Sequence, residues 1–589
     1  MTAKVEESLG LISVARGTGE ADLYLDGGNL VNVLSGEIYP ANVAVWNGKI
    51  AYVGLSRKMV TANTRVIDAG GCYLCPGLIE AHFHPWFVYN PVSIMEAALA
   101  SGTTTMLCDS LIFYINLGAE RFLKMLETLE NYPLRLFWTA RVMSHSPYPD
   151  EEEFFSIENL RKIFLDPHIL KVGEITRWPM LIQGDGGLVE KVNLAKEAGL
   201  GIDGHTAGSS YELLNAVVAA GVGSCHEAIT ADEIADRVRL GLWTMLRYSS
   251  LRPDLPDLVN VITEMNLSTH RMMLTTDCST PSFIAREGFL DRTLQIAVKR
   301  GLNPITALQM TTLNPAAYLG LDDELGSIAP GRWADLLLVE DLENFSPHLV
   351  FSRGELVAVD GKLTNSITEP DWGELGLYSS LPSLDLVANP ATYQVLGSRN
   401  EAFPVVELIS GAITRRRDRF LDEREGYLER EDDLLYCTLI NSCSNQVTNG
   451  LISGLGQFEA LATTLSSSLN LFVVGQEFSA MARAASKVVE MGGGIALIEK
   501  GEISYSFPLK LAGVMSDQSF AEAAAKIQEL DEKASALGYK YNDICFTLLF
   551  LTCDSLPVLR ITASGIIDVK NKRTVVPSRK TKINPGECR

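Results

Sequence analysis

The stretch that decides the fold is PGLIEAHFHP, residues 76–85. A Pro-Gly turn opens an apolar run, and the run ends in a His-x-His pair, His82 and His84. Side chains alternate along a strand, so both imidazoles point to the same face of the sheet. The pattern therefore predicts a buried strand whose end carries two metal-ligating groups.

Four further polar residues occupy comparable positions later in the chain. Two are single histidines, His205 in GIDGHTAG and His226 in GVGSCHE. The other two are carboxylates, Glu174 in KVGEIT and Asp277 in LTTDCSTP. Because a buried charge is costly unless it is paired or metal-bound, we expect these residues to join the histidine pair in one centre. Imidazole and carboxylate ligands suit Zn, Mn or Fe.

Strands and helices alternate between residues 76 and 321. The candidate strands cover residues 77–83, 103–109, 134–142, 171–175, 201–205, 221–226, 242–248 and 271–277. Their number and spacing fit a (β/α)8 barrel, and they also fit a long doubly wound sheet. The candidate ligands lie at or close to the carboxyl ends of strands, where barrel active sites form, so we favour the barrel.

The regions outside this segment have a different texture. Residues 21–56 and 326–363 alternate short β-rich runs with turn residues such as Asn47-Gly48 and Asp360-Gly361. We expect an α/β protein whose TIM-like barrel over 76–321 carries a small β-sandwich domain built from both flanks, residues 1–75 and 322–363. Residues 364–395 are expected to be a linker, and residues 396–589 a C-terminal α+β domain.

Composition limits the classes of function. The chain has 589 residues and a formal net charge of −22. This charge argues against nucleic acid or an anionic membrane as a partner, because both require a basic surface. The N-terminal residues lack the apolar core of a signal peptide, and no run approaches the roughly 18 apolar residues of a membrane span. Ten cysteines scattered through apolar segments favour a reducing, cytoplasmic setting.

The candidate centre suits hydrolysis of an unreactive C–N bond, because a divalent ion lowers the pKa of bound water from 15.7 toward about 7. We divide the ligands between two ions, the first held by His82, His84 and Asp277, the second by His205 and His226, with Glu174 bridging the two. Asp277 can also carry a proton to the leaving amine. Glu227 follows His226 directly and suits a second proton donor, although a supporting or surface carboxylate is the alternative.

The motifs resemble those of a known group of enzymes. PGLIEAHFH followed by SGTTTMLCD resembles the opening of the amidohydrolase superfamily barrel, and NPAAYLGLDDELGSIAPGRWADLLLV resembles its return into a small β domain. Within that superfamily the chain is most similar to adenine deaminases, over most of its length. IDGHTAG and ELLNAVVAAGVGSCHE resemble that family's fifth and sixth strand ends, GEI its bridging glutamate, and LTTDCSTP its catalytic-aspartate strand.

The resemblance implies a binuclear centre of Mn or Fe, with Zn also accepted. It further implies that a purine exchanges its 6-amino group for oxygen and releases ammonia. The partner is then a small-molecule purine. We also expect a homodimer, given the extra domain and the large apolar fraction.

The chain departs from the family's pattern around the centre. Pro85-Trp86-Phe87 replaces Glu-Ser-Ser, Cys278 replaces a second aspartate, Glu287-Gly288-Phe289 replaces Glu-Gly-His, Leu111 replaces a histidine after Asp109, and Ser466–Asn470 replaces His-Asp-Ser-His-Asn. Because an apolar pocket tolerates added methyl groups, we expect an altered preference, such as N6-alkyl adenine. The candidate substrate contacts are Trp86, Asp109, Arg247, Cys278, Glu287 and Phe289.

Two other functions remain open at this point. A cyclic amidohydrolase of the hydantoinase or dihydropyrimidinase type would use a carboxylated lysine between the metals, and Lys171 lies near enough to be considered. A non-catalytic scaffold could retain a structural metal, although all six candidate ligands are present.

Overall fold

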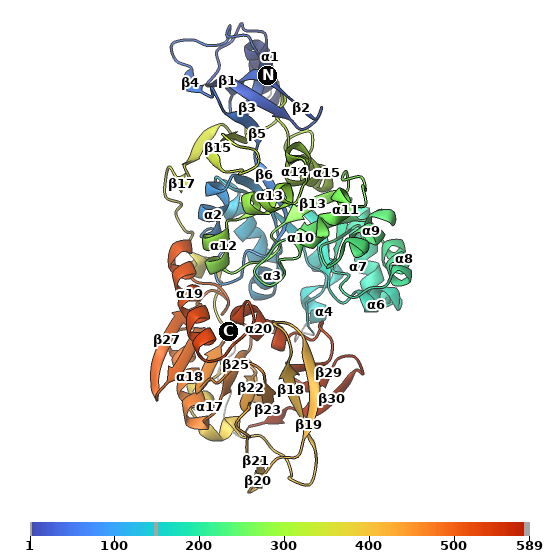
Figure 1. Ribbon diagram of the computed structural model, residues 1–589, viewed down its shortest axis with the longest axis vertical. Helices are drawn as coiled ribbons and strands as arrows, with labels where there is room; N and C mark the ends of the chain where they lie inside the picture. Colours follow the sequence, from blue (N-terminus) through green and yellow to red (C-terminus); the bar gives the residue numbers. More distant parts are fainter. Residues whose placement is uncertain (1–2, 147–150, 582–589) are drawn as a thin grey trace.

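The computed structural model describes residues 3–146 and 151–581 (Figure 1). Its centre is a set of parallel strands. Strand β6 (Leu78–Phe83), which carries His82, is buried along its whole length, as is its neighbour β7 (Thr103–Cys108). Strands with both faces buried are typical of parallel sheets covered by helices. The next strands in order are β8 (Arg135–Ala140), β9 (Ile169–Ile175) and β10 (Gly201–Gly204).

A second parallel sheet completes the barrel. It contains β11 (Ser224–Cys225), β12 (Trp243–Arg247) and β13 (Met272–Thr275). Isolated parallel bridges join the sheets, one between Ile202 and Val222 and the other between Phe83 and Asp277. The first and last strands therefore meet, and the eight expected strands form a TIM-type barrel. This closure rules out the doubly wound sheet, whose edge strands stay apart.

Glu80 fastens the first strand of the barrel to the last. Its carboxylate accepts hydrogen bonds from Thr275 Oγ1 at 2.5 Å and from the backbone N–H of Thr276 at 2.8 Å. The N–H of His82 donates to the same carboxylate at 3.2 Å. Burial raises the pKa of Glu80 to about 7 despite these hydrogen bonds. The contacts fix the position of His82 relative to the end of β13.

Helices cover the outside of the barrel. Helix α2 (Ile94–Ala100) packs on β7, α7 (Gly186–Glu197) on β10, α9 (Ala231–Arg239) on β12, and α13 (Leu290–Lys299) on β13. Helix α8 (Tyr211–Ala220) begins at Ser210, whose side chain accepts from Leu213 N, and α9 begins at Thr230 in the same way. These caps end the loops that carry His205 and His226, so the loops are short and anchored.

The segments before and after the barrel share one nine-stranded sheet. Strand β5 (Tyr73–Pro76) pairs antiparallel with β14 (Leu336–Val339), which joins the two flanks. The remaining strands are β1 (Leu23–Asn32), β2 (Glu37–Trp46), β3 (Lys49–Gly54), β4 (Arg65–Asp68), β15 (Pro347–Ser352), β16 (Glu355–Val359) and β17 (Lys362–Leu363). Helix α1 (Ala3–Ala15) packs against β2 and β3. The expected sandwich form of this unit stays a prediction.

The C-terminal part lies at the opposite end of the barrel from this sheet (Figure 1). It has a nine-stranded sheet of its own, with β18 (Phe403–Leu408), β19 (Thr414–Arg419), β22 (Leu434–Ile440), β23 (Gln446–Ser453), β24 (Ala460–Thr463), β25 (Leu471–Gly475), β26 (Gly494–Glu499), β27 (Glu502–Pro508) and β31 (Arg579–Lys580). A three-stranded sheet contains β28 (Leu559–Thr562), β29 (Gly565–Asp568) and β30 (Arg573–Pro577). Its main helices are α18 (Phe478–Glu490), α19 (Phe520–Ala536) and α20 (Ile544–Leu551).

The barrel and the C-terminal part share one continuous apolar core. A single cluster of buried residues runs from barrel positions such as Phe83 to C-terminal positions such as Phe546. Helix α19 packs against α12 (Pro281–Glu287), which follows the last barrel strand. The backbone adds a bridge, since Val88 N donates to Val514 O at 2.9 Å and Ser516 N donates to Val88 O at 2.7 Å. Within the described ranges, no helix combines the length and apolar character needed to cross a bilayer.

Candidate metal centre and its pocket

The expected ligands converge at the carboxyl ends of the barrel strands. His205 and His226 directly follow β10 and β11. Glu174 is near the end of β9, and Asp277 lies just beyond β13. The backbone φ of Asp277 is 53°, a left-handed conformation in which aspartate is enriched among non-glycine residues. The side chains gather into overlapping groups that could hold metal ions: His82 with Glu174 and His226, His82 with His84 and Asp277, and His205 with His226 and Glu227.

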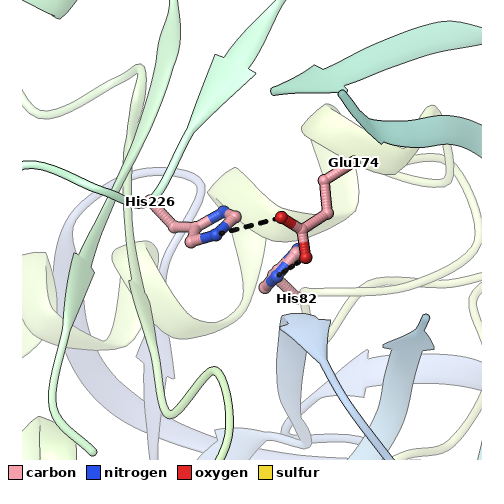
Figure 2. A group of neighbouring side chains, drawn as sticks. All are labelled: His82, Glu174 and His226. Atoms are coloured by element: carbon pink, nitrogen blue, oxygen red, sulfur yellow. Dashed lines mark ion pairs between the residues drawn. The ribbon is translucent and has the colours of Figure 1, made fainter. Parts of the chain in front are cut away.

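Glu174 lies between two pairs of histidines. Its Oε1 is 3.3 Å from His84 Nε2 and 4.0 Å from His82 Nε2. Its Oε2 is 2.7 Å from His205 Nδ1 and 4.0 Å from His226 Nε2. Figure 2 shows one oxygen of the carboxylate directed toward His82 and the other toward His226. Each oxygen of Glu174 thus faces a different pair of imidazoles.

The donor set fits divalent metal ions. Asp277 Oδ1 lies 3.6 Å from His82 Nε2 and 3.3 Å from His84 Nε2. In the described part of the chain, His82 Nε2 is buried and has no hydrogen-bond partner, and the close contact between His205 Nδ1 and Glu174 Oε2 lacks hydrogen-bond geometry. Buried polar atoms are almost always satisfied, so orphaned imidazole nitrogens facing carboxylates indicate a place for a cation.

Asp203 orients His82 from behind. Its Oδ2 accepts from His82 Nδ1 at 2.8 Å, and its Oδ1 accepts from Ser224 Oγ. An acceptor on Nδ1 leaves Nε2 free to bind a metal, which is the usual role of a carboxylate behind a metal-bound histidine. The sequence interpretation missed Asp203. The available signal was an acid two residues before His205, at the end of the same predicted strand.

Arg141 is a second residue that the sequence interpretation missed. It is fully buried after β8, and it donates to Asp109 through Nε, to the backbone O of Glu174 at 2.7 Å, and to Glu174 Oε1 at 3.1 Å. Burial alone would raise the pKa of Glu174, but Arg141 and His205 hold it well below its ordinary value. Arg141 stands in TARVMS, where no spacing or neighbour distinguishes it from a surface arginine.

Arg247 joins the two carboxylates expected to move protons. Its Nη1 donates to Glu227 Oε1 at 2.5 Å and to Asp277 Oδ2 at 2.8 Å. Glu227 in turn lies 3.5 Å from His226 and 3.7 Å from His205. Arg247 is only 3% exposed, and its Nε and Nη2 lack hydrogen-bond partners among the described residues.

A pocket opens over this centre. Barrel residues supply one part of its lining, including His84, Glu174, His205, His226, Glu227 and Asp277. Three of the expected substrate contacts, Trp86, Arg247 and Cys278, also line it. The remaining lining comes from the C-terminal part: Ala412, Ser467, Phe546, Leu549, Phe550, Cys553, Ser555 and Leu556. Among these, only Ser467 lies in a segment, Ser466–Asn470, that the sequence analysis placed around the centre.

The other three expected contacts lie outside the lining of the pocket. Asp109 sits behind it, where it accepts from Trp86 Nε1 at 3.2 Å and pairs with Arg141. Phe289 is 2% exposed and packs edge-to-face on Phe83. Glu287 ends α12 and pairs with Arg286 and Arg292.

The remaining histidines divide into two kinds. His145, in the loop after β8, lines the pocket and accepts from Arg141 Nη2 at 2.7 Å. His168, His270 and His348 pair with local acids or hydroxyls away from the centre, with Asp166, Ser268 and Asp360 respectively.

Lys171 does not approach the candidate ligands. Its ammonium lies over the ring of Tyr318, 4.4 Å from the ring centroid. Burial lowers its pKa to about 8. The position between the histidine pairs is occupied by Glu174, so a bridging lysine is not favoured.

Comparison with known proteins identifies the family. Residues 73–357 match the model of the amidohydrolase family, and residues 411–573 match that of the adenine deaminase C-terminal domain. Adenine deaminase 3 of Rhizobium meliloti is 33% identical over 95% of this chain and 96% of its own length. The adenine deaminase of Moorella thermoacetica is 30% identical over 95% and 96%. The chain belongs to the adenine deaminase family. It is accordingly a hydrolase that acts on C–N bonds.

Several departures from the adenine deaminase pattern lie at the pocket. Trp86, Cys278 and Ser467 all line it, and each stands where the family resemblance leads us to expect another polar or charged residue. Ser467 contacts the residue that follows α20, because its N–H donates to Thr552 Oγ1 at 3.0 Å. Three of the differences from the family pattern therefore lie where substrate would contact the protein, whereas Leu111 and Phe289 lie outside the lining.

Proposed function

We propose that this protein catalyses metal-dependent hydrolytic deamination of adenine or a related 6-aminopurine. Water and the aminopurine react to give the 6-oxopurine and ammonia. The observation that carries the proposal is the position of Glu174, whose two oxygens face separate histidine pairs. The purine is supported by the relatives, which are named adenine deaminases over nearly the whole length of the chain.

The proposed ligands are six side chains. His82, His84 and Asp277 would hold one ion, His205 and His226 the other, and Glu174 would contribute one oxygen to each. Mn or Fe is the expected metal, and Zn also accepts this donor set. When bound, such ions lower the pKa of water toward about 7 and so provide a nucleophile at neutral pH.

Asp277 is the proposed carrier of the proton. Its Oδ2 accepts from Arg247 at 2.8 Å, so the carboxylate is held in one orientation over the pocket. It would take a proton from the attacking water and deliver it to the departing amine. Glu227, held by the same guanidinium, would serve a ring nitrogen of the purine. Arg247 is thus a positioning residue for both carboxylates.

The pocket favours an altered choice of purine. Trp86 and Cys278 line it beside the ligands, and further apolar side chains surround the cavity. The lining beyond the candidate ligands is largely apolar, and an apolar surface discriminates weakly against an added methyl group. We therefore propose that N6-alkyl adenines are accepted alongside adenine.

A kinetic screen tests the proposal. The Mn- or Fe-loaded protein should release ammonia or methylamine from adenine and N6-methyladenine, with kcat/KM values within about a factor of 100 of each other. A preference for adenine by several orders of magnitude would refute the altered pocket and leave deamination standing. Failure on every aminopurine and nucleoside tried would refute deamination itself.

A variant of Asp277 separates catalysis from a scaffold role. Asp277→Asn should lower kcat by roughly 10²- to 10⁴-fold, because a positioned proton carrier contributes about that much. Metal analysis should still find bound ions, since the amide oxygen and five other ligands remain. Asp341→Asn, on an exposed turn where its side chain contacts only local groups, is the control. Equal activity in wild type and Asp277→Asn would contradict the assignment.

A further proposal concerns the assembly and the setting of the protein. We propose a homodimer acting on a small molecule in the cytoplasm, without nucleic-acid or membrane partners. We likewise propose that the chain divides into a composite β domain, a barrel, a linker and a C-terminal domain with the bounds expected from the sequence. Light scattering coupled to size exclusion would test the dimer, and a mass near 64.3 kDa would contradict it.

A further inference from the structure

The pocket has a wall that the chemistry described above does not use. Residues 546–556 contribute six lining side chains: Phe546, Leu549, Phe550, Cys553, Ser555 and Leu556. None of the six carries a formal charge, whereas the barrel side of the pocket is crowded with ionisable groups. We call residues 546–556 the C-terminal wall. Its position beside the metal centre makes it a candidate for contact with the part of the substrate that does not react.

A ladder of aromatic rings connects this wall to the loop that follows the histidine pair. Phe87 stacks on Phe546, with ring centroids 4.0 Å apart and planes 13° apart. Phe546 in turn stacks on Phe550 at 5.6 Å and 20°. Phe87 and Phe546 are 0% and 4% exposed, so Phe550 is the partly exposed end of the ladder. A fixed aromatic ring at the edge of a pocket is a surface on which a flat heteroaromatic ring can stack.

Arg560 holds the wall in place. It is 1% exposed, and its guanidinium donates to Ala412 O at 2.7 Å, Phe550 O at 3.2 Å and Leu556 O at 3.4 Å. All three acceptors are backbone carbonyls of residues that line the pocket. A buried guanidinium is costly unless its donors are satisfied, and here they are satisfied by two carbonyls of the C-terminal wall and by Ala412 O, so the side chain joins two segments of the lining.

We propose that the C-terminal wall determines which purines bind, with Phe550 as the stacking contact and Arg560 as its positioning residue. The inference rests on the proposed deaminase function and assigns the C-terminal part a role in it. The ligand class is a neutral, planar heteroaromatic amine of purine size. The uncharged side chains around Phe550 accommodate apolar substituents, while the barrel side holds the reacting amine.

Phe550→Ala is the direct test, because its side chain is partly exposed and its loss is compatible with folding. It should raise KM for adenine by roughly 5- to 100-fold, the range expected for losing one stacked ring. The kcat should stay within about threefold, because Phe550 touches no reacting atom. The ratio of kcat/KM for 8-methyladenine to that for adenine should rise, since the variant opens space for a substituent on the part of the purine that does not react. If Phe550 had a purely structural role, kcat/KM would fall by the same factor for both substrates.

Phe478→Ala is the matched control. Phe478 is also a partly exposed phenylalanine of the C-terminal part, but it packs on Tyr436 and lies outside the lining of the pocket. Its replacement should leave KM and the substrate ratio unchanged. Arg560→Lys should shift KM in the same direction as Phe550→Ala, and the double variant should be little worse than the stronger single one. If Arg560→Lys does not fold, Phe550→Ala decides the matter alone.

Calorimetric binding of hypoxanthine separates failure of this inference from failure of the deaminase proposal. If the wild type is active and Phe550→Ala leaves KM and the substrate ratio unchanged, the proposed role of the C-terminal wall is wrong and the deaminase proposal stands. A wild type that releases no ammonia but binds hypoxanthine, with binding weakened at least fivefold by Phe550→Ala, overturns deamination and supports the wall. A wild type that neither reacts with nor binds purines overturns both.

Discussion

Glu174 is the residue on which the arrangement of the centre depends. Its two oxygens divide four imidazoles into two pairs, with Oε1 facing His84 and Oε2 facing His205 at the shortest distances. A single histidine or aspartate could be lost and still leave part of one ion's ligands. Loss of the Glu174 carboxylate would remove a donor from both ions at once.

Replacement of Glu174 and of Lys171 should therefore have opposite outcomes. Glu174→Gln should lower the bound metal below one ion per chain, because a neutral amide is a poor bridge between two cations. Lys171→Met should keep the wild-type metal content, since the ammonium lies over Tyr318 rather than among the ligands. Elemental analysis after dialysis measures both. Metal loss in the lysine variant alone would restore the bridging-lysine hypothesis.

Asp203 offers a finer test at the same scale. Asp203→Asn should weaken metal binding by roughly 10- to 100-fold, the usual effect of removing a carboxylate behind a ligating histidine. The matched control is Asp166→Asn, which alters a similar histidine–aspartate contact with His168 at 2.9 Å, far from the centre. Competition with a fluorescent chelator would give both affinities. Equal affinities in the two variants would contradict an orienting role for Asp203.

At the scale of elements, the barrel strands were predictable and the helix of the wall was not. Strands such as β6 and β7 are uninterrupted apolar runs bounded by turns, and that pattern predicts buried parallel strands. Helix α20 reads ICFTLLFL, which is apolar on every side and so gives no indication of which face meets a pocket. Its contact with Phe87 spans more than four hundred residues of sequence.

Both oxygens of the Asp543 carboxylate help to anchor α20. One oxygen accepts from Phe546 N at 3.1 Å as the helix cap, and the other accepts from Ser250 Oγ of the barrel at 2.7 Å. Asp543→Ala should lower the free energy of unfolding by about 2 kcal/mol, because α20 loses its cap and the Ser250 hydroxyl loses its acceptor. Asp185→Ala removes only an exposed cap, that of α7, and should cost about 1 kcal/mol. Equal losses in chemical denaturation would contradict the second contact.

The same residue predicts a dependence on pH. Burial raises the pKa of Asp543 to about 6, above the roughly 3.9 of an unfolded aspartate. The folded state therefore binds this proton more tightly than the unfolded state does. As the pH rises from about 4 to about 6, Asp543 ionises and the free energy of unfolding falls. Asp543→Asn cannot ionise, so its stability relative to wild type should improve across that window. A constant difference between pH 4 and pH 7 would contradict this.

At the scale of the whole molecule, metal binding should stabilise the entire barrel. The candidate ligands come from five strand ends distributed around the ring, so the ions bind only a folded barrel. At a free metal concentration 100 times Kd, the gain is about 2.7 kcal/mol. Added Mn²⁺ should raise the melting temperature of chelator-treated protein, and His226→Ala should reduce the rise. His348→Ala, on strand β15 outside the barrel, should leave the rise in melting temperature unchanged.

The centre was more predictable than the pocket for a physical reason. Ligands such as His82 and His205 sit at strand ends, and parallel topology alone brings strand ends together. The residues that orient them, Asp203 and Arg141, act through side-chain directions that no local pattern encodes. The pocket is harder to predict, because Phe550 and Trp86 line the same cavity only after two distant parts of the chain have packed. The unit most open to error in sequence reasoning was therefore the substrate side.

The bridge between Phe83 and Asp277 has a consequence for how the protein is made. During synthesis, the chain contains both histidines of the first pair long before Asp277 emerges, and the Glu80 contacts with Thr275 and Thr276 form later still. Contacts of such large sequence separation form late and slowly. A nascent chain on the ribosome thus holds only an incomplete set of donors. The protein can therefore bind its full set of metal ions only after the barrel has closed. Metal content is accordingly a marker of completed folding.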